Sequence, residues 1–363
     1  ASGISLQSSQ ADFHELNALL DLFSSRYNFL LTALCLICQF VQFAKQHCNA
    51  NTPPVSVQYS NNHPPIMSSG EQFQSGWLPK PTDQEFPGKE GKLPVEAQYD
   101  TLPDYKGGFQ KYKAAGKLQG QRAIITGGDS GIGRATAVLF AQEGADVLIA
   151  YLPAEQKDAE ETKKMVESHG KKCHLFPADL SERSNCQKVV DEAVKVMGGI
   201  DILFNNMAYQ MMVPDIKDLT EDQWVHTFNT NIHPFFYISK YALPHMRPGC
   251  TIINNASINA YIGRPDLLDY TSTKGAIVSF TRGLSNQFVH KGIRVNAVAP
   301  GPVWTPLIPA TMNEEAQKQF TAPQGRPSQP SEIASCVVFL ASPDSSALSG
   351  QVIHCNGGTI VNG

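Results

Sequence analysis

The chain has 363 residues, 42% of them hydrophobic and 17% charged, and its formal net charge is −4. These values are typical of a globular protein with a sizeable core. No stripe of Lys and Arg interleaves with aromatic residues, so we expect no nucleic-acid partner. The cysteines follow no disulfide or zinc spacing, and the C-x-x-C pair of Cys35 and Cys38 has no second pair in register. We therefore expect no metal site.

Residues 1–66 precede the first methionine, Met67. We expect them to be sequence upstream of a natural start there; a processed fragment or a cloning remnant are the alternatives. Residues 28–44 form a mostly apolar run of roughly 17 residues, the lower limit for spanning a bilayer. Polar residues interrupt this run, and it lacks the layout of a secretory signal. We expect a functionless helix or disordered leader on a cytoplasmic protein; the alternative is a membrane anchor or an organelle-targeting element.

Residues 67–117 are rich in Pro, Gly, Gln and Asn, which predicts an extended arm with turns. Across residues 118–363, short apolar runs alternate with amphipathic, helix-like segments such as 154–168 and 184–197. The predicted strands are 122–126, 146–151, 172–177, 200–204, 251–255, 293–298 and 351–354. Apolar strands that alternate with helices indicate a parallel sheet covered on both faces. We predict an α/β fold, a single doubly wound Rossmann-type domain with a seven-stranded parallel sheet, preceded by the arm and without a separate substrate domain.

A glycine-rich segment, T-G-G-D-S-G-I-G, follows the first predicted strand and opens a helix. Glycines at 127, 131 and 133 allow a tight turn and let the backbone approach a pyrophosphate. The helix that follows directs its free N–H groups and the positive end of its dipole at the phosphates. The position of this segment between strand and helix predicts a dinucleotide site.

The second predicted strand ends at Tyr151-Leu152-Pro153, where a site for NAD usually offers an acid to the ribose 2′-hydroxyl. The first acid is Glu155, which leaves space for a 2′-phosphate. We therefore predict NADP(H) as the preferred cofactor, although no Arg or Lys stands at this point. NAD(H) is the alternative.

Tyr270 and Lys274 stand four residues apart, on one face of a predicted helix. A free tyrosine has a pKa near ~10, and a neighbouring cation favours the phenolate and lowers that value. Ser257 follows the fifth predicted strand, at the edge of the sheet where open α/β proteins bind ligands. Its hydroxyl is a candidate to hold a substrate oxygen beside Tyr270.

Together, these motifs resemble the short-chain dehydrogenase/reductase family from residue 118 to the C-terminus. The resemblance implies a catalytic tetrad of Asn231, Ser257, Tyr270 and Lys274. It implies cofactor contacts at Gly127, Asp129, Ser130, Gly131, Ile132, Gly133, Tyr151, Asp179, Leu180, Asn205, Tyr270, Lys274, Pro300, Gly301, Val303 and Thr305. Met207 departs from the pattern, because the family has a small residue there. Further stretches, including Phe86-Pro87-Gly88-Lys89, look like the group of NADPH-dependent aldehyde reductases and glucose/ribitol dehydrogenases.

The resemblance implies that Tyr270 exchanges a proton with the substrate oxygen while a hydride moves between the cofactor and a carbonyl or alcohol carbon. Lys274 would bind the nicotinamide ribose and lower the tyrosine pKa, and Asn231 would hold a water that reprotonates the pair. Gln210, Tyr261 and Trp304 are candidate substrate contacts, and we interpret residues 304–326 as a mobile substrate lid.

The predicted function is the reduction of an aldehyde or ketone to an alcohol, or the reverse, by an enzyme with a small-molecule carbonyl or alcohol substrate. The alternatives are an NAD-dependent sugar or polyol dehydrogenase, a non-catalytic dinucleotide sensor, and a membrane-tethered reductase anchored by residues 28–44. The resemblance also implies a homotetramer.

Overall fold

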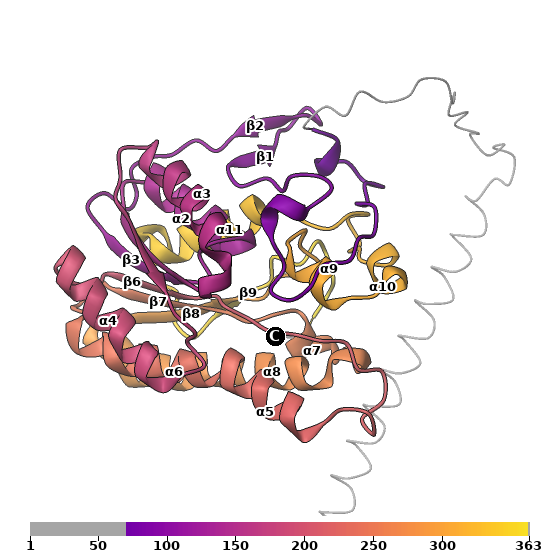
Figure 1. Ribbon diagram of the computed structural model, residues 1–363. Coiled ribbons are helices and arrows are strands. Elements are labelled where there is room, and N and C mark those ends of the chain that lie inside the picture. The colour runs from indigo at the N-terminus through magenta and orange to yellow at the C-terminus, as the bar shows by residue number, and fades with distance from the viewer. Residues whose placement is uncertain (1–69, 362–363) are drawn as a thin grey trace, which may run out of the picture. The chain divides into compact units, whose positions relative to one another are not determined.

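The computed structural model describes residues 70–361, so the apolar run 28–44 and the pair Cys35 and Cys38 lie outside the described residues. Seven parallel strands form one sheet in the order β5-β4-β3-β6-β7-β8-β9 (Figure 1). They are β3 (Arg122–Thr126), β4 (Asp146–Tyr151), β5 (Cys173–Pro177), β6 (Ile202–Asn205), β7 (Thr251–Asn255), β8 (Arg294–Val298) and β9 (Val352–Ile353). The predicted doubly wound α/β fold is confirmed.

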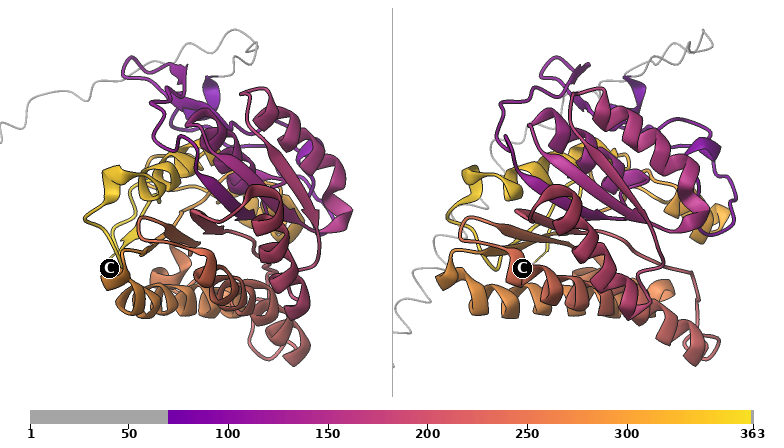
Figure 2. Two further views of the ribbon diagram at one scale, coloured as in Figure 1. Left: turned by 90° about the vertical axis from the view of Figure 1, so that its left-hand side faces the viewer. Right: turned by 60° about the vertical axis from the view of Figure 1, so that its left-hand side comes forward.

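Helices cover both faces of the sheet, as the views in Figure 2 show. One layer holds α2 (Gly131–Gln142), α3 (Gln156–Glu167) and α11 (Pro330–Ala341). The other holds α4 (Arg183–Met197), α5 (Glu221–Asn231), α6 (His233–Ala242) and α8 (Leu268–Phe288). Alternate side chains of the buried strands, such as Ile125 and Ile124 on β3, enter two separate apolar cores. This burial on both faces explains why the strands are apolar throughout.

Four of the seven strands differ at their ends from the sequence prediction: β5 and β8 each begin one residue later, and β6 and β9 differ by more. Strand β6 begins at Ile202, two residues later than predicted. The carboxylate of Asp201 accepts hydrogen bonds from the backbone N–H of Arg122 at 3.1 Å and from its guanidinium at 2.7 and 2.9 Å. Strand β9 has two residues rather than the predicted four. Hydrophobic periodicity sets the end of a strand only to within a few residues, so differences of this size are expected.

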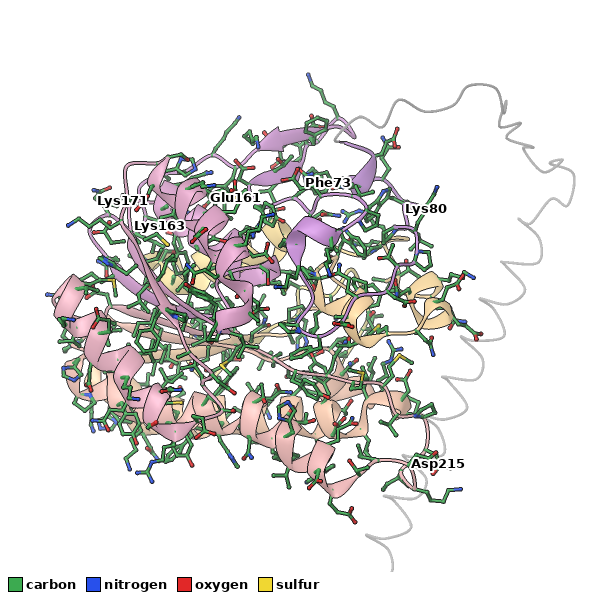
Figure 3. The ribbon with its side chains drawn as sticks, in the orientation of Figure 1. Phe73, Lys80, Glu161, Lys163, Lys171 and Asp215 are labelled. Carbon is green, nitrogen blue, oxygen red and sulfur yellow. The ribbon has the colours of Figure 1, made fainter. Side chains whose placement is uncertain are left out.

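Residues 70–117 form the arm, which packs along the layer of α2 and α11. It contains η1 (Glu71–Phe73), η2 (Glu90–Lys92) and a hairpin of β1 (Thr101–Pro103) and β2 (Phe109–Lys111). Ala97 and Tyr99 of the arm belong to the same apolar core as α2 and α11. Figure 3 labels Phe73 and Lys80 on the first part of the arm. The arm is thus extended, as its composition indicates, and is also joined to the domain by buried side chains.

The segment predicted to be the lid lies between β8 and α11 and contains two short helices, α9 (Leu307–Thr311) and α10 (Glu314–Lys318). Another short helix, α7 (Asn259–Ile262), follows β7. The arm runs beside α9 in Figure 1. The backbone N–H of Gln84 donates to the carbonyl of Pro309 at 3.0 Å, and the side chain of Gln317 bonds both backbone groups of Thr82. The arm therefore ties the lid segment at two points.

None of the helices within residues 70–361 combines the length and the apolar character that crossing a membrane requires.

Candidate active site

The carboxyl ends of the strands surround a cavity of about 400 Å³. Its walls come from the loops after β3, β4, β5, β6, β7 and β8, together with the arm and the lid segment. This is the edge at which parallel α/β sheets bind ligands, because the loops there diverge at the switch in strand order between β3 and β6.

The glycine-rich turn after β3 is shaped by close backbone contacts. Gly127 and Gly131 have φ values of 62° and 49°, which side chains rarely allow. A Cβ at Gly133 would lie 1.8 Å from the carbonyl oxygen of Gly127, so only glycine lets α2 start beneath the turn. The amide of Asn206 donates to the carbonyls of Thr126 and Gly127, each at 3.0 Å. The turn is thus held from β6 as well as from its own strand.

The predicted chemical residues lie at the other end of the cavity. Tyr270 and Lys274 come from α8, and Ser257 follows β7; all three line the cavity. The Lys274 Nζ donates to the carbonyl of Asn255 at 2.7 Å and lies 5.3 Å from the centre of the Tyr270 ring. The side chain of Ser257 lies near the hydroxyl of Tyr270. The structure therefore brings Ser257, from the loop after β7, to the same part of the cavity as Tyr270 and Lys274 of α8.

Burial dominates the protonation states of this group. It raises the pKa of Tyr270 to about 12, while the nearby side chain of Ser257 opposes the rise. Burial also lowers the pKa of Lys274 to about 7. The tyrosine is consequently a protonated donor across the physiological range, and the lysine titrates near neutrality.

The start of α8 is fixed by a buried acid. Asp269 accepts a hydrogen bond from the backbone N–H of Tyr270 at 2.8 Å, from Thr227 at 2.7 Å and from Gln223 at 3.1 Å. A carboxylate in the first turn also interacts favourably with the helix dipole. These bonds anchor α8 to α5 and orient Tyr270 toward the cavity.

Asn231, the fourth predicted member, lies behind the cavity wall. Its amide oxygen accepts the backbone N–H of Tyr209 at 2.7 Å, and its NH₂ group donates to the Tyr209 carbonyl at 2.8 Å and to Thr273 at 3.1 Å. Asn231 therefore joins the loop after β6 to α8. Its part in a water relay stays a prediction.

Known proteins share this arrangement. A family profile described as Enoyl-(Acyl carrier protein) reductase matches residues 127–359. The glucose and ribitol dehydrogenase of Daucus carota is 50% identical over 304 residues, which cover 82% of this chain and 100% of the relative. The NADPH-dependent aldehyde reductase 1, chloroplastic, of Arabidopsis thaliana is 48% identical over 284 residues, 76% of this chain and 96% of the relative.

The chain belongs to the short-chain dehydrogenase/reductase family. Solved structures agree: a short-chain dehydrogenase from Burkholderia cenocepacia in complex with NADP has a TM-score of 0.62 at 30% identity, covering 67% of this chain and 98% of that one. The short-chain dehydrogenase/reductase of Serratia marcescens has a TM-score of 0.63 at 32% identity, with coverage of 67% and 98%. The chain is therefore an oxidoreductase that uses a nicotinamide dinucleotide.

The cavity fits such a cofactor. Gly127, Ser130 and Gly131 of the turn line the cavity, so a phosphate could approach the turn there. The Asp129 side chain is 2% exposed, and its Oδ2 atom has no hydrogen-bond partner. Most of the predicted cofactor residues line the cavity, namely Gly127, Asp129, Ser130, Gly131, Ile132, Tyr151, Asp179, Leu180, Tyr270, Lys274, Pro300, Gly301, Val303 and Thr305. Gly133 lies directly beneath the turn instead.

Asn205 is a correction to the predicted cofactor set. Its side chain is fully buried in the sheet, where it donates to Asn254 at 2.9 Å and to Ser239 at 3.3 Å. The next two residues, Asn206 and Met207, line the cavity in its place. The strand continues through Asn205, so the loop reaches the cavity one residue later than predicted.

Trp304 and Tyr261 are also placed outside the cavity lining, whereas Gln210 lines it and donates to Thr311 at 2.9 Å. Trp304 is 1% exposed, and its indole N–H donates to the carbonyl of Val95 in the arm at 2.9 Å. The Tyr261 ring packs edge-on against His354. Packing against the arm and the C-terminal segment therefore occupies two side chains that we predicted to contact substrate.

The arm supplies site residues that the sequence analysis missed. Phe86, Pro87 and Gly88 line the cavity, and Phe86 packs edge-on against Tyr209 at a ring separation of 5.0 Å. The Phe86-Pro87-Gly88-Lys89 stretch stood out only as a point of resemblance. Its position over the cavity depends on a contact with the lid, because a Cβ at Gly88 would lie 2.1 Å from the carbonyl oxygen of Pro306.

The substrate end of the cavity combines apolar and polar walls. The apolar residues are Ile262, Leu307, Ile308, Met312 and Phe320. His226, Arg264 and Gln319 add polar groups that the sequence analysis did not select. Within residues 70–361 no cluster of His, Cys, Asp and Glu is arranged to hold a metal ion.

A methyl group at Gly88 tests the contact between arm and lid. We expect Gly88→Ala to lower the free energy of unfolding by about 1–3 kcal/mol, since overpacking forces backbone to move. We also expect a higher KM for the carbonyl substrate, because the displaced arm forms one wall of the cavity. Thermal unfolding and steady-state kinetics measure both. Gly91→Ala is the matched control, because its Cβ meets nothing within 4 Å; equal melting temperatures for the two variants would contradict the contact.

The titration of Lys274 predicts a pH dependence. Its ammonium form, which can bind the cofactor ribose, is populated below its pKa of about 7 and is lost as the pH rises. We expect kcat/KM for the dinucleotide, which reports the free enzyme, to fall above this value. The dinucleotide Kd of Tyr270→Phe should show the same pH dependence, since the lysine titrates there too. A kcat/KM that stays constant from about pH 6 to about pH 9 would refute the assignment.

Proposed function

We propose that the protein is an NADPH-dependent reductase of aldehydes or ketones. The observation that carries this proposal is the shared cavity, which holds the glycine-rich turn at one end and Ser257, Tyr270 and Lys274 at the other. When bound, the cofactor supplies a hydride to the carbonyl carbon, or accepts one in the reverse direction. The relative from Arabidopsis thaliana, named as an NADPH-dependent aldehyde reductase, supports the proposal.

The side chains of the chain handle the substrate oxygen and its proton. The Tyr270 hydroxyl donates its proton to the carbonyl oxygen as the alcohol forms, and its raised pKa keeps that proton available. The Ser257 hydroxyl donates a hydrogen bond to the same oxygen and stabilises the developing negative charge. The charged form of Lys274 holds the nicotinamide ribose and assists the return of a proton to Tyr270. Asn231 keeps α8 and the loop after β6 in register.

The preference for NADPH draws support from the arm. The Nζ of Lys89 donates to the carbonyl of Ala154 in η3 (Pro153–Glu155), directly after the β4 end where a ribose 2′-substituent would lie. Gly88, the preceding residue, lines the cavity beside this loop. Lys89 is therefore the candidate cation for a 2′-phosphate at the end of β4, where the sequence itself has no Arg or Lys.

An NAD-dependent sugar or polyol dehydrogenase is the second candidate. Glu155 lines the cavity, and its carboxylate accepts the backbone N–H of Leu152 at 3.2 Å. Burial and the proximity of Asp129 raise the pKa of Glu155. A carboxyl group here could accept the ribose 2′-hydroxyl of NAD. The relative from Daucus carota, named as a glucose and ribitol dehydrogenase, is consistent with this alternative.

We also propose a homotetramer. Exposed apolar side chains gather on the outer helices, with Trp224 and Val225 on α5, Phe236 on α6 and Leu268 on α8. Exposed apolar patches of this kind mark surfaces that associate.

The first test compares NADPH with NADH on a panel of aldehydes, aldoses and polyols, using the full chain and Tyr270→Phe. We expect NADPH-dependent aldehyde reduction, and a kcat lower by about 10²–10⁴-fold in the variant, because the proton donor is lost. The variant should bind NADPH as wild type does. NADH-dependent polyol oxidation would favour the second candidate. Binding without turnover on any substrate would favour a dinucleotide sensor.

Lys89→Gln tests the cation at the ribose end. We expect kcat/KM for NADPH to fall by about tenfold, which corresponds to about 1.4 kcal/mol, while the value for NADH stays within about twofold. The matched control is Lys92→Gln, since Lys92 is an exposed cation in the same arm. An equal loss with both cofactors would show that Lys89 acts on the arm rather than on the 2′-phosphate.

A further inference from the structure

The arm places a buried carboxylate against the glycine-rich turn. The Oε1 atom of Glu90 accepts the backbone N–H of Gly131, the first residue of α2, at 3.0 Å. The second oxygen accepts a hydrogen bond from the hydroxyl of Tyr99. Glu90 is only 7% exposed, and it does not line the cavity. Its side chain is therefore directed at the protein scaffold and not at a ligand.

Hydrogen bonds around Glu90 join the arm to the glycine-rich turn, to α2 and to α3. Its own backbone N–H donates to Asp158 on α3 at 3.1 Å. The guanidinium of Arg134 lies 5.1 Å from the Tyr99 ring and donates to the carbonyl of Asp129 in the turn at 2.9 Å. Arg134 also donates to the Asp158 carbonyl at 3.0 Å. Arm, turn, α2 and α3 thus share one buried polar network.

The hydrogen bond from Gly131 to Glu90 occupies one of the free N–H groups at the start of α2. The first N–H groups of a helix have no partner inside the helix. Glu90 takes the N–H of Gly131, which leaves the N–H of Ile132, a residue that lines the cavity, for an anion. Burial raises the pKa of Glu90, and its Oε1 atom can accept the Gly131 N–H whether the group is charged or neutral.

We propose that Glu90 is a positioning residue for dinucleotide binding, which holds the glycine-rich turn in its phosphate-binding conformation before the cofactor arrives. The inference rests on the proposed function, because it takes the turn to be the pyrophosphate site. Its physical basis is preorganisation: a turn that is already ordered in the free protein loses less conformational entropy on binding. The residue acts through Gly131 and touches neither cofactor nor substrate.

The test compares Glu90→Ala, Glu90→Gln and the control Glu96→Ala in the full chain. Glu96 is an exposed residue of the same arm; the Gln72 side chain donates to its backbone carbonyl at 2.8 Å, a bond that the substitution leaves in place. We expect Glu90→Ala to raise the Kd of NADPH, measured by fluorescence, about tenfold while kcat at saturating cofactor changes less than about threefold. Glu90→Gln should bind within about threefold of wild type, because its carbonyl oxygen can still accept the Gly131 N–H.

Hydrogen exchange supplies a readout that does not depend on turnover. We expect the amides of residues 127–134 to exchange faster in Glu90→Ala than in wild type, with no change in Glu96→Ala. Tyr99→Phe is a milder second variant for the case in which Glu90→Ala does not fold. It removes only the hydroxyl that orients the carboxylate and should raise the Kd about two- to fourfold.

The outcomes separate this inference from the proposed function. Wild-type protein that binds no NADPH or NADH would overturn the proposed function. Wild-type binding together with unchanged Kd and unchanged exchange in Glu90→Ala, or in Tyr99→Phe if Glu90→Ala is unfolded, would overturn the role of Glu90 alone. A lower melting temperature with an unchanged Kd for the folded fraction would show a purely structural role and would also overturn it.

Discussion

The contact between Gly133 and the carbonyl of Gly127 is the constraint on which the cofactor end depends. A Cβ at Gly133 would also lie 2.8 Å from the amide nitrogen of Asn206, so helix, turn and the β6 loop meet at one crowded point. The amide of Asn206 donates to two carbonyls of the turn. Strands β3 and β6 are neighbours at the switch in sheet order, and this bridge therefore sets the turn at the point where ligands bind.

Local patterns made the sheet and much of the site predictable. Short runs with apolar centres, Ala-Ile-Ile in β3 and Ile-Ile in β7, identified these strands with their bounds unchanged, and both strands are buried on both faces of the sheet. The spacing of Tyr270 and Lys274 predicted a shared helix face, and both line the cavity. Asn205 entered the predicted cofactor set through the family resemblance, and a motif match does not decide whether a residue at the end of a strand points into the sheet or into the loop.

The contacts of the arm could not be predicted from the sequence, for a different reason. Its contacts join residues that are distant in sequence, such as Glu90 with Gly131 and Gly88 with Pro306, and no periodic pattern encodes such pairs. Composition alone predicts an extended segment. This is correct for the backbone of the arm, but it does not predict which part of the domain the arm covers. Trp304 is an example. From its position after a strand we predicted a substrate contact, but in the structure its indole N–H donates to the carbonyl of Val95 in the arm.

The protonation states of Tyr270 and Lys274 depend more on their burial than on their spacing along α8. The sequence predicts that Lys274 lowers the pKa of Tyr270, yet burial raises the tyrosine pKa and lowers that of the lysine. Both shifts favour the neutral form, as desolvation requires when no charged partner compensates. An anionic cofactor at this end would favour the charged lysine, and a charged lysine would in turn favour the phenolate.

The same reasoning applies at the ribose end, where the carboxyl groups of Asp129 and Glu155 have raised pKa values and Lys89 stands nearby. We therefore propose that discrimination between the two cofactors would depend on a balance of charges that includes the arm, rather than on a single residue at the end of β4.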